Sequence, residues 1–344
     1  MLVAEVSGPG ELRLRERPEP VAMPGTAVVA ITRSGISGAD VHAWRTGRTS
    51  PGAAFGTEWV GRVVAVGPGA MGRFEGERVV LGALPPCGTC GLCRRGDSRL
   101  CSTALEAALG VGPQAPDHGG FAPRIRVDAR RLARLPEGLD DDDAVLAPAA
   151  SVAAHAVAGT GQRLGDVVAV IGGGTLGLMT AEFARLAGSR RVVVVEPDPA
   201  RRELACSLGA DAAFATPGRD AVGHLLDLSW GLGADVVYEC SGDGDAVAAA
   251  LALVRRGGRI TVLGAAPELR LDPVSWLLKE VAMTTSVGFG VEELSRTLDL
   301  LAEDRLRVGP LHQDQPIPLG ELPARFGDVA LGRGAVKTLV DPGD

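Results

Sequence analysis

The chain has 344 residues, 46% of them hydrophobic and 22% charged, and its formal net charge is −7. The length predicts about two folded domains, and the acidic balance argues against a general nucleic-acid surface, which needs clustered Lys and Arg. No apolar run reaches the ~18 residues of a membrane span, and residues 1–18 lack the apolar core of a signal peptide. We therefore expect a cytoplasmic protein whose cysteines are thiols or metal ligands rather than disulfides.

The first 80 residues show short strand-like runs at 27–31, 59–66 and 77–81. Turn signals separate these runs, among them Pro24-Gly25 and the sequence Gly-Pro-Gly at 67–69. This pattern predicts a compact β-rich domain.

Four of the six cysteines follow within fifteen residues, with the spacing C-x₂-C-x₂-C-x₇-C: Cys87, Cys90, Cys93 and Cys101. Four thiolates without a histidine suit a closed tetrahedral zinc site, which leaves no open position for chemistry. An iron–sulfur cluster is the competing metal, but the isolated cluster lacks the Cys-Pro ending of ferredoxins. A metal-free loop would leave four thiols open to oxidation. We predict one structural zinc ion.

After an acidic run at 140–143, which we interpret as a solvated helix start, strands and helices alternate regularly. Six such strands joined by helices predict an α/β domain with a doubly wound parallel sheet. The expected strands are 167–171, 192–196, 212–215, 236–239, 259–263 and 282–287, with helices at 175–187, 199–208, 221–229 and 246–254. An amphipathic helix at 292–306 should return the chain to the β-rich domain.

Between the first of these strands and its helix, Gly172, Gly174 and Gly177 are spaced as G-x-G-x-x-G. The first glycine allows a tight turn, the second lets the backbone approach a pyrophosphate, and the third lets the helix pack against the strand. N–H groups of the helix start, at Thr175 and Leu176, then point at the anion. The alternative is a glycine-rich turn without a ligand, but the full βαβ context favours dinucleotide binding.

Glu196 lies nineteen residues after Gly177, where a carboxylate can accept hydrogen bonds from a ribose diol. It would repel a 2′-phosphate, so NAD(H) is favoured over NADP(H), although the adjacent arginines at 201 and 202 could offset this. Later loops at Ser241 and at Gly264-Ala265 should lie at the carboxyl edge of the sheet, beside the nicotinamide. Two further cysteines, at 206 and 240, are expected to be buried small hydrophobes.

The chain resembles the zinc-containing alcohol dehydrogenase-like branch of the medium-chain dehydrogenases/reductases. The likeness runs nearly end to end and rests on the four-cysteine segment, the nucleotide fingerprint, Gly119-Gly120-Phe121-Ala122, Glu239-Cys240-Ser241-Gly242 and Gly334-Ala335-Val336-Lys337. It implies a GroES-like β-barrel catalytic domain (1–151 and 290–344, zinc lobe 85–102) joined to a Rossmann domain (152–289), with the active site in the cleft between them.

The same resemblance implies that Lys337 reaches the pyrophosphate, although a surface lysine is the plain alternative. It also implies a homodimer or homotetramer, with the strand at 282–287 as a dimer edge.

The chain departs from that family where the family holds a catalytic zinc ion. The family's C-G-[ST]-D-x-H segment reads Ser37-Gly38-Ala39-Asp40-Val41-His42, and its G-H-E segment reads Gly56-Thr57-Glu58. The third ligand position aligns with Ala147 or Pro148, neither of which can bind a metal. A neutral hydroxyl is a poor zinc ligand, so we expect no catalytic zinc. Asp40, His42 and Glu58 could still hold a metal, but the resemblance places them behind it.

Without zinc, hydroxyls at Ser37 and Thr57 could stabilise developing negative charge, and Asp40, His42 or Glu58 could supply a proton. Each of these residues also has a purely structural explanation, and the tryptophans at 44 and 59 are better explained by core packing. The leading hypothesis is an NAD(H)-dependent oxidoreductase that acts on an activated C=C, C=N or C=O bond of a small molecule. The alternatives are an alcohol or polyol dehydrogenase that uses Ser37 and Thr57 in place of zinc, and a catalytically silent dinucleotide-binding protein.

Overall fold

The computed structural model describes residues 1–47, 55–108, 118–265, 268, 271–313 and 315–343. The chain forms two compact units. Unit 1 comprises Met1–Pro148 and Gly290–Asp344, and unit 2 comprises Ala149–Phe289. Unit 1 is therefore built from both ends of the chain, whereas unit 2 is one continuous segment.

Unit 1 is built on β structure. A hairpin of β1 (Leu2–Gly8) and β2 (Glu11–Glu16) accompanies a seven-stranded sheet in the order β14-β15-β3-β4-β5-β7, with β6 also paired to β3. Among the named strands that the structure describes in this sheet, only β14 and β15 pair in parallel. The strands of this sheet are β3 (Thr26–Gly35), β4 (Glu58–Val66), β5 (Arg78–Leu81), β6 (Arg124–Asp128), β7 (Leu132–Arg134), β14 (Ile317–Pro318) and β15 (Leu339–Asp341).

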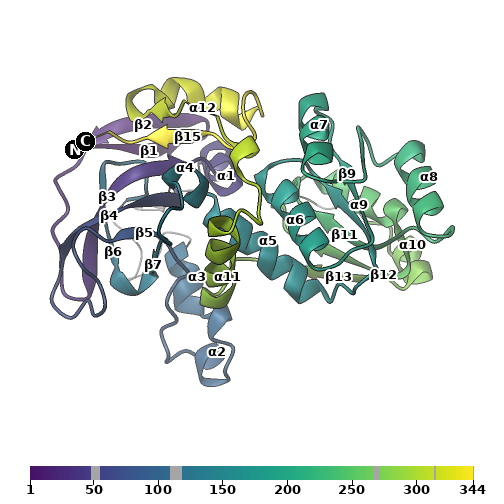
Figure 1. Cartoon of the computed structure of the whole chain (residues 1–344), viewed down its shortest axis with the longest axis horizontal. Helices are drawn as coiled ribbons and strands as arrows, with labels where there is room; N and C mark the ends of the chain where they lie inside the picture. Colours follow the sequence, from purple (N-terminus) through teal and green to yellow (C-terminus); the bar gives the residue numbers. More distant parts are fainter. Residues whose placement is uncertain (48–54, 109–117, 266–267, 269–270, 314, 344) are drawn as a thin grey trace. The chain divides into compact units, whose positions relative to one another are not determined.

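Short helices complete unit 1. Helix α12 packs against β2 (Figure 1). The ring centroid of its Phe326 lies 5.5 Å from that of Trp44 and 5.4 Å from that of Phe55. The helices are α1 (Gly38–Thr46), α2 (Gly91–Arg94), α3 (Ser102–Ala108), α4 (Asp141–Ala144), α11 (Val291–Ala302) and α12 (Leu322–Ala330), with 3₁₀ turns η1 (Ser98–Leu100), η2 (Ala129–Arg131), η3 (Gly309–Leu311) and η4 (Leu319–Glu321).

Trp59 stands at the centre of the sheet core of unit 1. It is 1% exposed and packs among the valines and isoleucines that β3, β4, β5 and β6 direct to one face. The prediction that Trp44 and Trp59 serve packing is confirmed, because Trp44 belongs to the second core of the unit, beside α12.

Unit 2 is a six-stranded, fully parallel sheet in the order β10-β9-β8-β11-β12-β13. The chain runs outward from β8 to β10, then returns to the other side of β8, so β8 and β11 mark the point where the strand order reverses. Ligands bind at the carboxyl edge of such a reversal. The strands are β8 (Val167–Ile171), β9 (Arg191–Val195), β10 (Ala212–Phe214), β11 (Ala234–Glu239), β12 (Val254–Val262) and β13 (Ala282–Thr285).

The helices of unit 2 alternate with these strands (Figure 1). Strand β8, and strand β9 after its exposed first residue Arg191, are runs of Val, Ala and Ile that are almost fully buried, as expected for a sheet covered on both faces. The helices are α5 (Ala147–Thr160), which begins at the end of the first segment of unit 1, α6 (Thr175–Leu186), α7 (Pro199–Ser207), α8 (Arg219–Leu228), α9 (Gly244–Leu253) and α10 (Pro273–Lys279).

All six predicted strands of this sheet are present, and the largest difference is at β12. It begins at Val254 rather than 259, because Ala234 pairs with Val254 and Val236 pairs with Arg259, so residues 255–258 form an irregularity in the ladder, with Gly257 at φ +64°. The burial of Cys206 was predicted wrongly, because this residue lies on the exposed side of α7. Cys240 is partly buried, and burial raises the pKa of its thiol to about 12. Among the described residues, no helix has the length and apolar character needed to cross a membrane.

Trp59→Ala should destabilise the protein by about 3–5 kcal/mol, because it removes a large buried side chain from the core of unit 1. Trp230→Ala is the matched control, because Trp230 is 82% exposed. Among the described residues, the only aromatic or cation–π contact of its ring is with Arg190. The Trp230→Ala substitution should lower the free energy of unfolding by less than about 1 kcal/mol. Urea unfolding followed by circular dichroism measures both values. Equal losses would contradict the assignment of Trp59 to the core.

Candidate active site

The three fingerprint glycines have different structural roles in the turn from β8 into α6. Gly172 has φ +101°, and a Cβ there would lie 2.9 Å from the backbone nitrogen of Ser241. A Cβ on Gly177 would lie only 1.9 Å from the carbonyl oxygen of Gly172, so this glycine allows the helix to pack against the turn. A Cβ on Gly174 would meet nothing within 4 Å. Gly174 is therefore not required by the protein's own packing, which fits backbone kept open for a ligand.

Glu196, directly after β9, is fixed by this same turn. Its carboxylate accepts hydrogen bonds from the backbone nitrogens of Gly173 (2.6 Å) and Asp198 (2.9 Å), and the residue is 8% exposed. Arg202 donates to the backbone oxygens of Glu196 (2.8 Å) and Pro197 (2.6 Å), so its guanidinium follows the loop backbone. The acidic group predicted to meet a ribose is thus held rigidly at the carboxyl edge of the sheet.

Glu239, the last residue of β11, connects the two remaining loops of this edge. One carboxyl oxygen accepts hydrogen bonds from the Ser241 nitrogen (2.6 Å), the Ser241 hydroxyl and the Gly242 nitrogen (3.1 Å). Its backbone oxygen accepts from Leu263 (2.8 Å) and Gly264 (3.1 Å). Burial raises the pKa of this carboxyl, against the hydrogen bonds from Ser241. The predicted residues Ser241, Gly264 and Ala265 therefore lie side by side.

This role of Glu239 was not predicted from the sequence. The available signal is a glutamate at a strand end beside small residues, because such a carboxylate can organise the N–H groups of the next turn.

The four cysteines of the predicted zinc lobe come together. Their sulfur atoms all lie within 4.8 Å of one another, with 3.9 Å between Cys90 and Cys101. Four ligands at the usual Zn–S length stand ~3.8 Å apart around a tetrahedron. Hydrogen bonds from the hydroxyl and backbone of Thr89 lower the pKa of Cys87 to about 5. The donor set and its spacing fit a closed, structural zinc site formed by Cys87, Cys90, Cys93 and Cys101.

The two segments that replace the family's catalytic ligands also meet, and we call residues 35–40 and 56–58 the cradle. Asp40, in the first turn of α1, is 1% exposed, and its carboxylate accepts from the Ser37 nitrogen (2.8 Å), the Ser37 hydroxyl (2.6 Å) and the Gly56 nitrogen (2.7 Å). Burial raises the pKa of Asp40, and these hydrogen bonds oppose the rise. The Ser37 hydroxyl proton is therefore directed to Asp40, because a buried carboxylate competes strongly for donors.

Glu58 pairs with Lys337. The lysine is 1% exposed, and its ammonium donates to the Glu58 carboxylate and to the Ile36 oxygen (2.9 Å). The alternative that Lys337 is a surface lysine is therefore wrong. Its ammonium is directed to a buried carboxylate, since a buried charge needs a counter-charge. Contact between Lys337 and the pyrophosphate stays a prediction.

The remaining predicted residues lie at the rim of the cradle or outside it. Thr57, which lies between Gly56 and Glu58 in the sequence, is partly buried, whereas His42 on α1 is exposed. Ala147 and Pro148 stand at the start of α5. Within the described part of the chain, the four cysteines are the only group of three or more His, Cys, Asp or Glu side chains placed to hold a metal ion. Asp40, His42 and Glu58 are not brought together as such a group.

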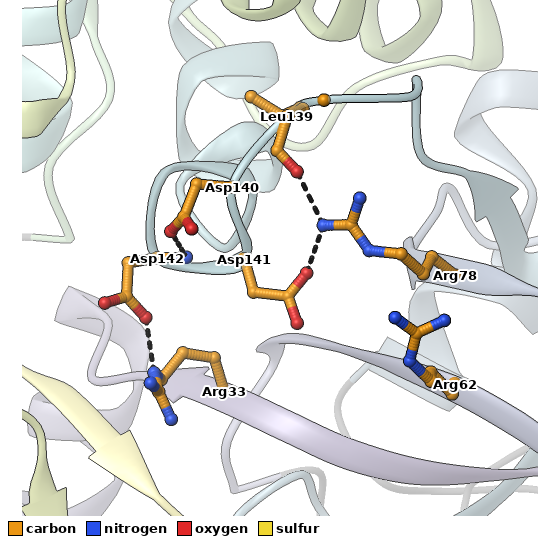
Figure 2. A pocket seen from close by; sticks show the side chains of 8 residues that line it. Arg33, Arg62, Arg78, Leu139, Asp140, Asp141 and Asp142 are labelled. Atoms are coloured by element: carbon orange, nitrogen blue, oxygen red, sulfur yellow. Dashed lines mark hydrogen bonds and ion pairs between the residues drawn. The ribbon is translucent and has the colours of Figure 1, made fainter.

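The acidic run at α4 is paired rather than simply solvated, which corrects the sequence interpretation. Arg33 pairs with Asp142 and Arg78 pairs with Asp141, as Figure 2 shows, and His312 lies 2.9 Å from Asp143. The hydrogen bond that the His312 ring donates to the Asp143 carboxylate raises the pKa of His312. Arg62 also lines the shallow pocket beside these pairs. The two arginine–aspartate ion pairs join α4 to β3 and β5.

Comparison with known proteins identifies the class. Residues 23–137 match the family model of the alcohol dehydrogenase GroES-like domain, and residues 175–303 match that of the zinc-binding dehydrogenase. The predicted GroES-like domain and Rossmann-type sheet are both confirmed.

Relatives span the whole chain. A sorbitol dehydrogenase of Halalkalibacterium halodurans is 30% identical over 350 residues, covering 100% of this chain and 99% of the relative. An alcohol dehydrogenase from Thermus sp. ATN1 is 30% identical with a TM-score of 0.83, and a dehydrogenase of Sinorhizobium meliloti 1021 bound to NADP is 28% identical with a TM-score of 0.85. Each structural match covers 99% of both chains. The chain belongs to the zinc-type alcohol dehydrogenase-like family of medium-chain dehydrogenases/reductases, and it is an NAD(P)-dependent oxidoreductase.

The purified protein should contain about one zinc ion per chain, held by the four-cysteine lobe. Cys87→Ser should remove most of it, because a hydroxyl replaces a thiolate ligand, while Cys206→Ser on the exposed face of α7 should leave the content unchanged. Elemental analysis after gel filtration measures both. Full zinc content in Cys87→Ser would show that the metal lies elsewhere.

Gly174→Ala and Gly177→Ala should separate ligand binding from packing. The added Cβ at 174 meets no protein atom, so the unfolding midpoint should stay unchanged while the Kd for NADH rises roughly tenfold or more. The Cβ at 177 collides with backbone and should cost about 1–3 kcal/mol of stability. Fluorescence titration and thermal unfolding give the two readouts. Undiminished NADH binding by Gly174→Ala would place the cofactor away from this turn.

Proposed function

We propose that this oxidoreductase transfers hydride between NAD(H) and a small molecule without a metal ion in its cradle. The observation that carries the proposal is the cradle's donor set. Ser37 and Thr57 are hydroxyls, Asp40 is satisfied by three protein donors, and Glu58 is paired with Lys337. Such groups bind zinc poorly, because zinc prefers thiolate, imidazole or an unengaged carboxylate.

The substrate class follows from that donor set. A catalytic zinc ion would supply several kcal/mol of stabilisation to an alkoxide, and hydroxyl donors replace only part of it, ~3 kcal/mol for one well-placed group. We therefore favour a substrate already primed for hydride addition at a conjugated C=C, C=N or C=O bond. Thr57 is the candidate donor to the developing negative charge. Asp40, reached through the Ser37 hydroxyl, Glu58 and His42 are the candidate proton carriers.

The proposed division of labour assigns proton transfer to residues 1–151 and 290–344 and the dinucleotide to residues 152–289. The pyrophosphate is proposed to meet the start of α6 at Gly172, Gly174, Thr175, Leu176 and Gly177. The adenosine ribose is proposed to meet Glu196, and the nicotinamide half is proposed to lie near Ser241, Gly264 and Ala265. Glu196 favours NAD(H), because its carboxylate accepts from a free 2′-hydroxyl and repels a 2′-phosphate.

A second candidate is an alcohol or polyol dehydrogenase that uses Ser37 and Thr57 in place of zinc. The full-length likeness to a sorbitol dehydrogenase favours it. An alcohol proton accepted by the Ser37 oxygen could pass to Asp40, since the serine hydroxyl already donates to that carboxylate at 2.6 Å. A catalytically silent dinucleotide-binding protein is the third possibility, in which the same hydrogen bonds are structural only.

A homodimer or homotetramer is proposed from the edge of the unit 2 sheet. All four residues of β13 are exposed, and Leu277 and Leu278 of the neighbouring α10 are 75% and 63% exposed. An edge strand with free backbone groups beside apolar side chains favours pairing with a second copy.

The deciding experiment combines a substrate panel with metal analysis of the same sample. NADH and NADPH oxidation is followed with enones, imines and aldehydes, and NAD⁺ reduction with polyols. We expect about one zinc per chain, turnover of an activated acceptor, and a preference for NADH. Restoring the ligands with Ser37→Cys and Thr57→His should not improve that turnover.

Two zinc ions per chain with polyol oxidation would overturn the zinc-free proposal. Turnover of polyols at one zinc ion per chain would favour the second candidate. Tight NADH binding without turnover of any panel member would favour the silent protein.

A further inference from the structure

The turn at residues 240–242, directly after β11, lies close to two other loops of unit 2. A Cβ on Gly172 would lie 2.9 Å from the backbone nitrogen of Ser241, and a Cβ on Gly264 would lie 2.2 Å from that of Gly242. Both the fingerprint turn and the loop after β12 therefore approach it too closely for a side chain. The position of this turn thus affects both loops to which the cofactor is assigned.

The carboxyl group of Glu239 ends at the same place. Its Oε1 accepts from the Ser241 nitrogen (2.6 Å), the Ser241 hydroxyl and the Gly242 nitrogen (3.1 Å). Its Oε2 lies 2.7 Å from the position that a Cβ on Gly264 would take. The Ser241 hydroxyl in turn accepts from the nitrogen of Asp243 (3.1 Å), the N-cap residue of α9. One side chain therefore joins the end of β11 to the turn, to the neighbouring loop and to the start of the next helix.

The two carboxyl oxygens of Glu239 differ in their hydrogen bonds. Oε1 has three donors, whereas Oε2 is the only buried carboxyl oxygen of the described residues without a hydrogen-bond partner. Asp40 and Glu196 each accept hydrogen bonds at both oxygens. Glu58 has the ammonium of Lys337. Of these four buried acids, Glu239 is the one for which ionisation would leave an oxygen buried without a donor or a cation, which is costly.

The surroundings of Glu239 also favour its neutral form. The residue is 0% exposed, and burial raises the pKa of its carboxyl group. Asp243, a second acid, raises that pKa further, while the hydrogen bonds from Ser241 and Gly242 oppose the rise. Because the three donors occupy Oε1, the proton of the neutral acid belongs on Oε2. A buried O–H group without an acceptor costs less than a buried unpaired charge.

We propose that Glu239 is a positioning residue for the cofactor and that it performs this role as the neutral acid. Its uncharged carboxyl group holds the turn at 240–242 and the loop at Gly264 in the arrangement that receives the nicotinamide half. When Glu239 ionises, the charge on Oε2 must gain a partner from water, and the movement that admits water loosens both loops. Cofactor binding therefore weakens as the pH rises. The inference rests on the proposed placement of the nicotinamide half beside these loops.

The test compares Glu239→Gln and Glu239→Ala in the full-length protein. Glutamine imitates the neutral acid, because its carbonyl oxygen can replace Oε1 and its amide can replace the protonated Oε2, whereas it cannot imitate a carboxylate. Asp227→Asn is the matched control, since Asp227 is an exposed acid on α8 of the same unit. The Kd for NADH is measured by fluorescence titration over a range of pH, and infrared difference spectra detect a protonated carboxyl group.

Glu239→Ala should raise the Kd for NADH by roughly tenfold to a hundredfold, because three donors lose their acceptor, while Glu239→Gln should stay within about twofold at neutral pH. In the unmodified protein the Kd should rise as the pH passes through the raised pKa of Glu239, and in Glu239→Gln it should not. Asp243→Asn should bring this rise to lower pH, because removing the second acid lowers the pKa of Glu239, while asparagine still caps α9. Asp227→Asn should behave as the unmodified protein.

Equal losses of NADH affinity in Glu239→Gln and Glu239→Ala would overturn the inference, because the protein would then need the carboxylate. The same pH dependence of the Kd in the unmodified protein and in Glu239→Gln would also overturn it. The infrared difference spectrum needs neither cofactor nor substrate, so it separates this inference from the proposed function. At neutral pH the unmodified protein should show a protonated-carboxyl band that Glu239→Gln lacks, and no such band would overturn the inference even if NADH binds.

Discussion

The cost of burying a carboxylate governs both sites of this protein. An ionised carboxyl group taken out of water must be given hydrogen-bond donors or a cation. Asp40 accepts hydrogen bonds from two backbone N–H groups and a hydroxyl, and Glu58 pairs with the ammonium of Lys337. In unit 2, Glu196 and Glu239 each collect backbone N–H groups from the glycine-containing turns beside them. Each acid therefore fixes the loop that supplies its donors, and these are the loops assigned to chemistry and cofactor.

Local sequence was enough to predict the elements of unit 2 and the metal lobe. Strands and helices of unit 2 can be recognised from local hydrophobic patterns. The fingerprint glycines and the four cysteines lie close together in the chain, so their spacing can be read directly. Contacts between segments far apart in the chain leave no local sequence pattern by which they could be predicted. The pairing of Arg78 with Asp141 joins residues 63 positions apart, and the pairing of Lys337 with Glu58 joins residues 279 positions apart. The sequence could indicate that Lys337 was special, but only the β3 ladders reveal which carboxylate it meets.

The cradle also explains how a family scaffold can keep its shape while its donor set changes. Ser37 caps α1 and completes a capping box with Asp40, so the position retains a helix-starting role whatever chemistry it performs. Gly56 is held at φ +88° by close packing against Phe121, and its N–H is directed to Asp40. These backbone requirements are independent of a metal ion. They preserve the arrangement of the two segments while the side chains between them vary.

The division of the chain also affects the order in which the protein can be completed during synthesis. Unit 2 is one uninterrupted segment, whereas the sheet of unit 1 is complete only when β15 pairs with β3 and β14 pairs with β15. The ribosome delivers Lys337 after every residue of unit 2, so the nascent first segment must hold Glu58 without its cation for most of translation. The parallel sheet can form first, and the barrel-like unit closes around its buried ion pair last.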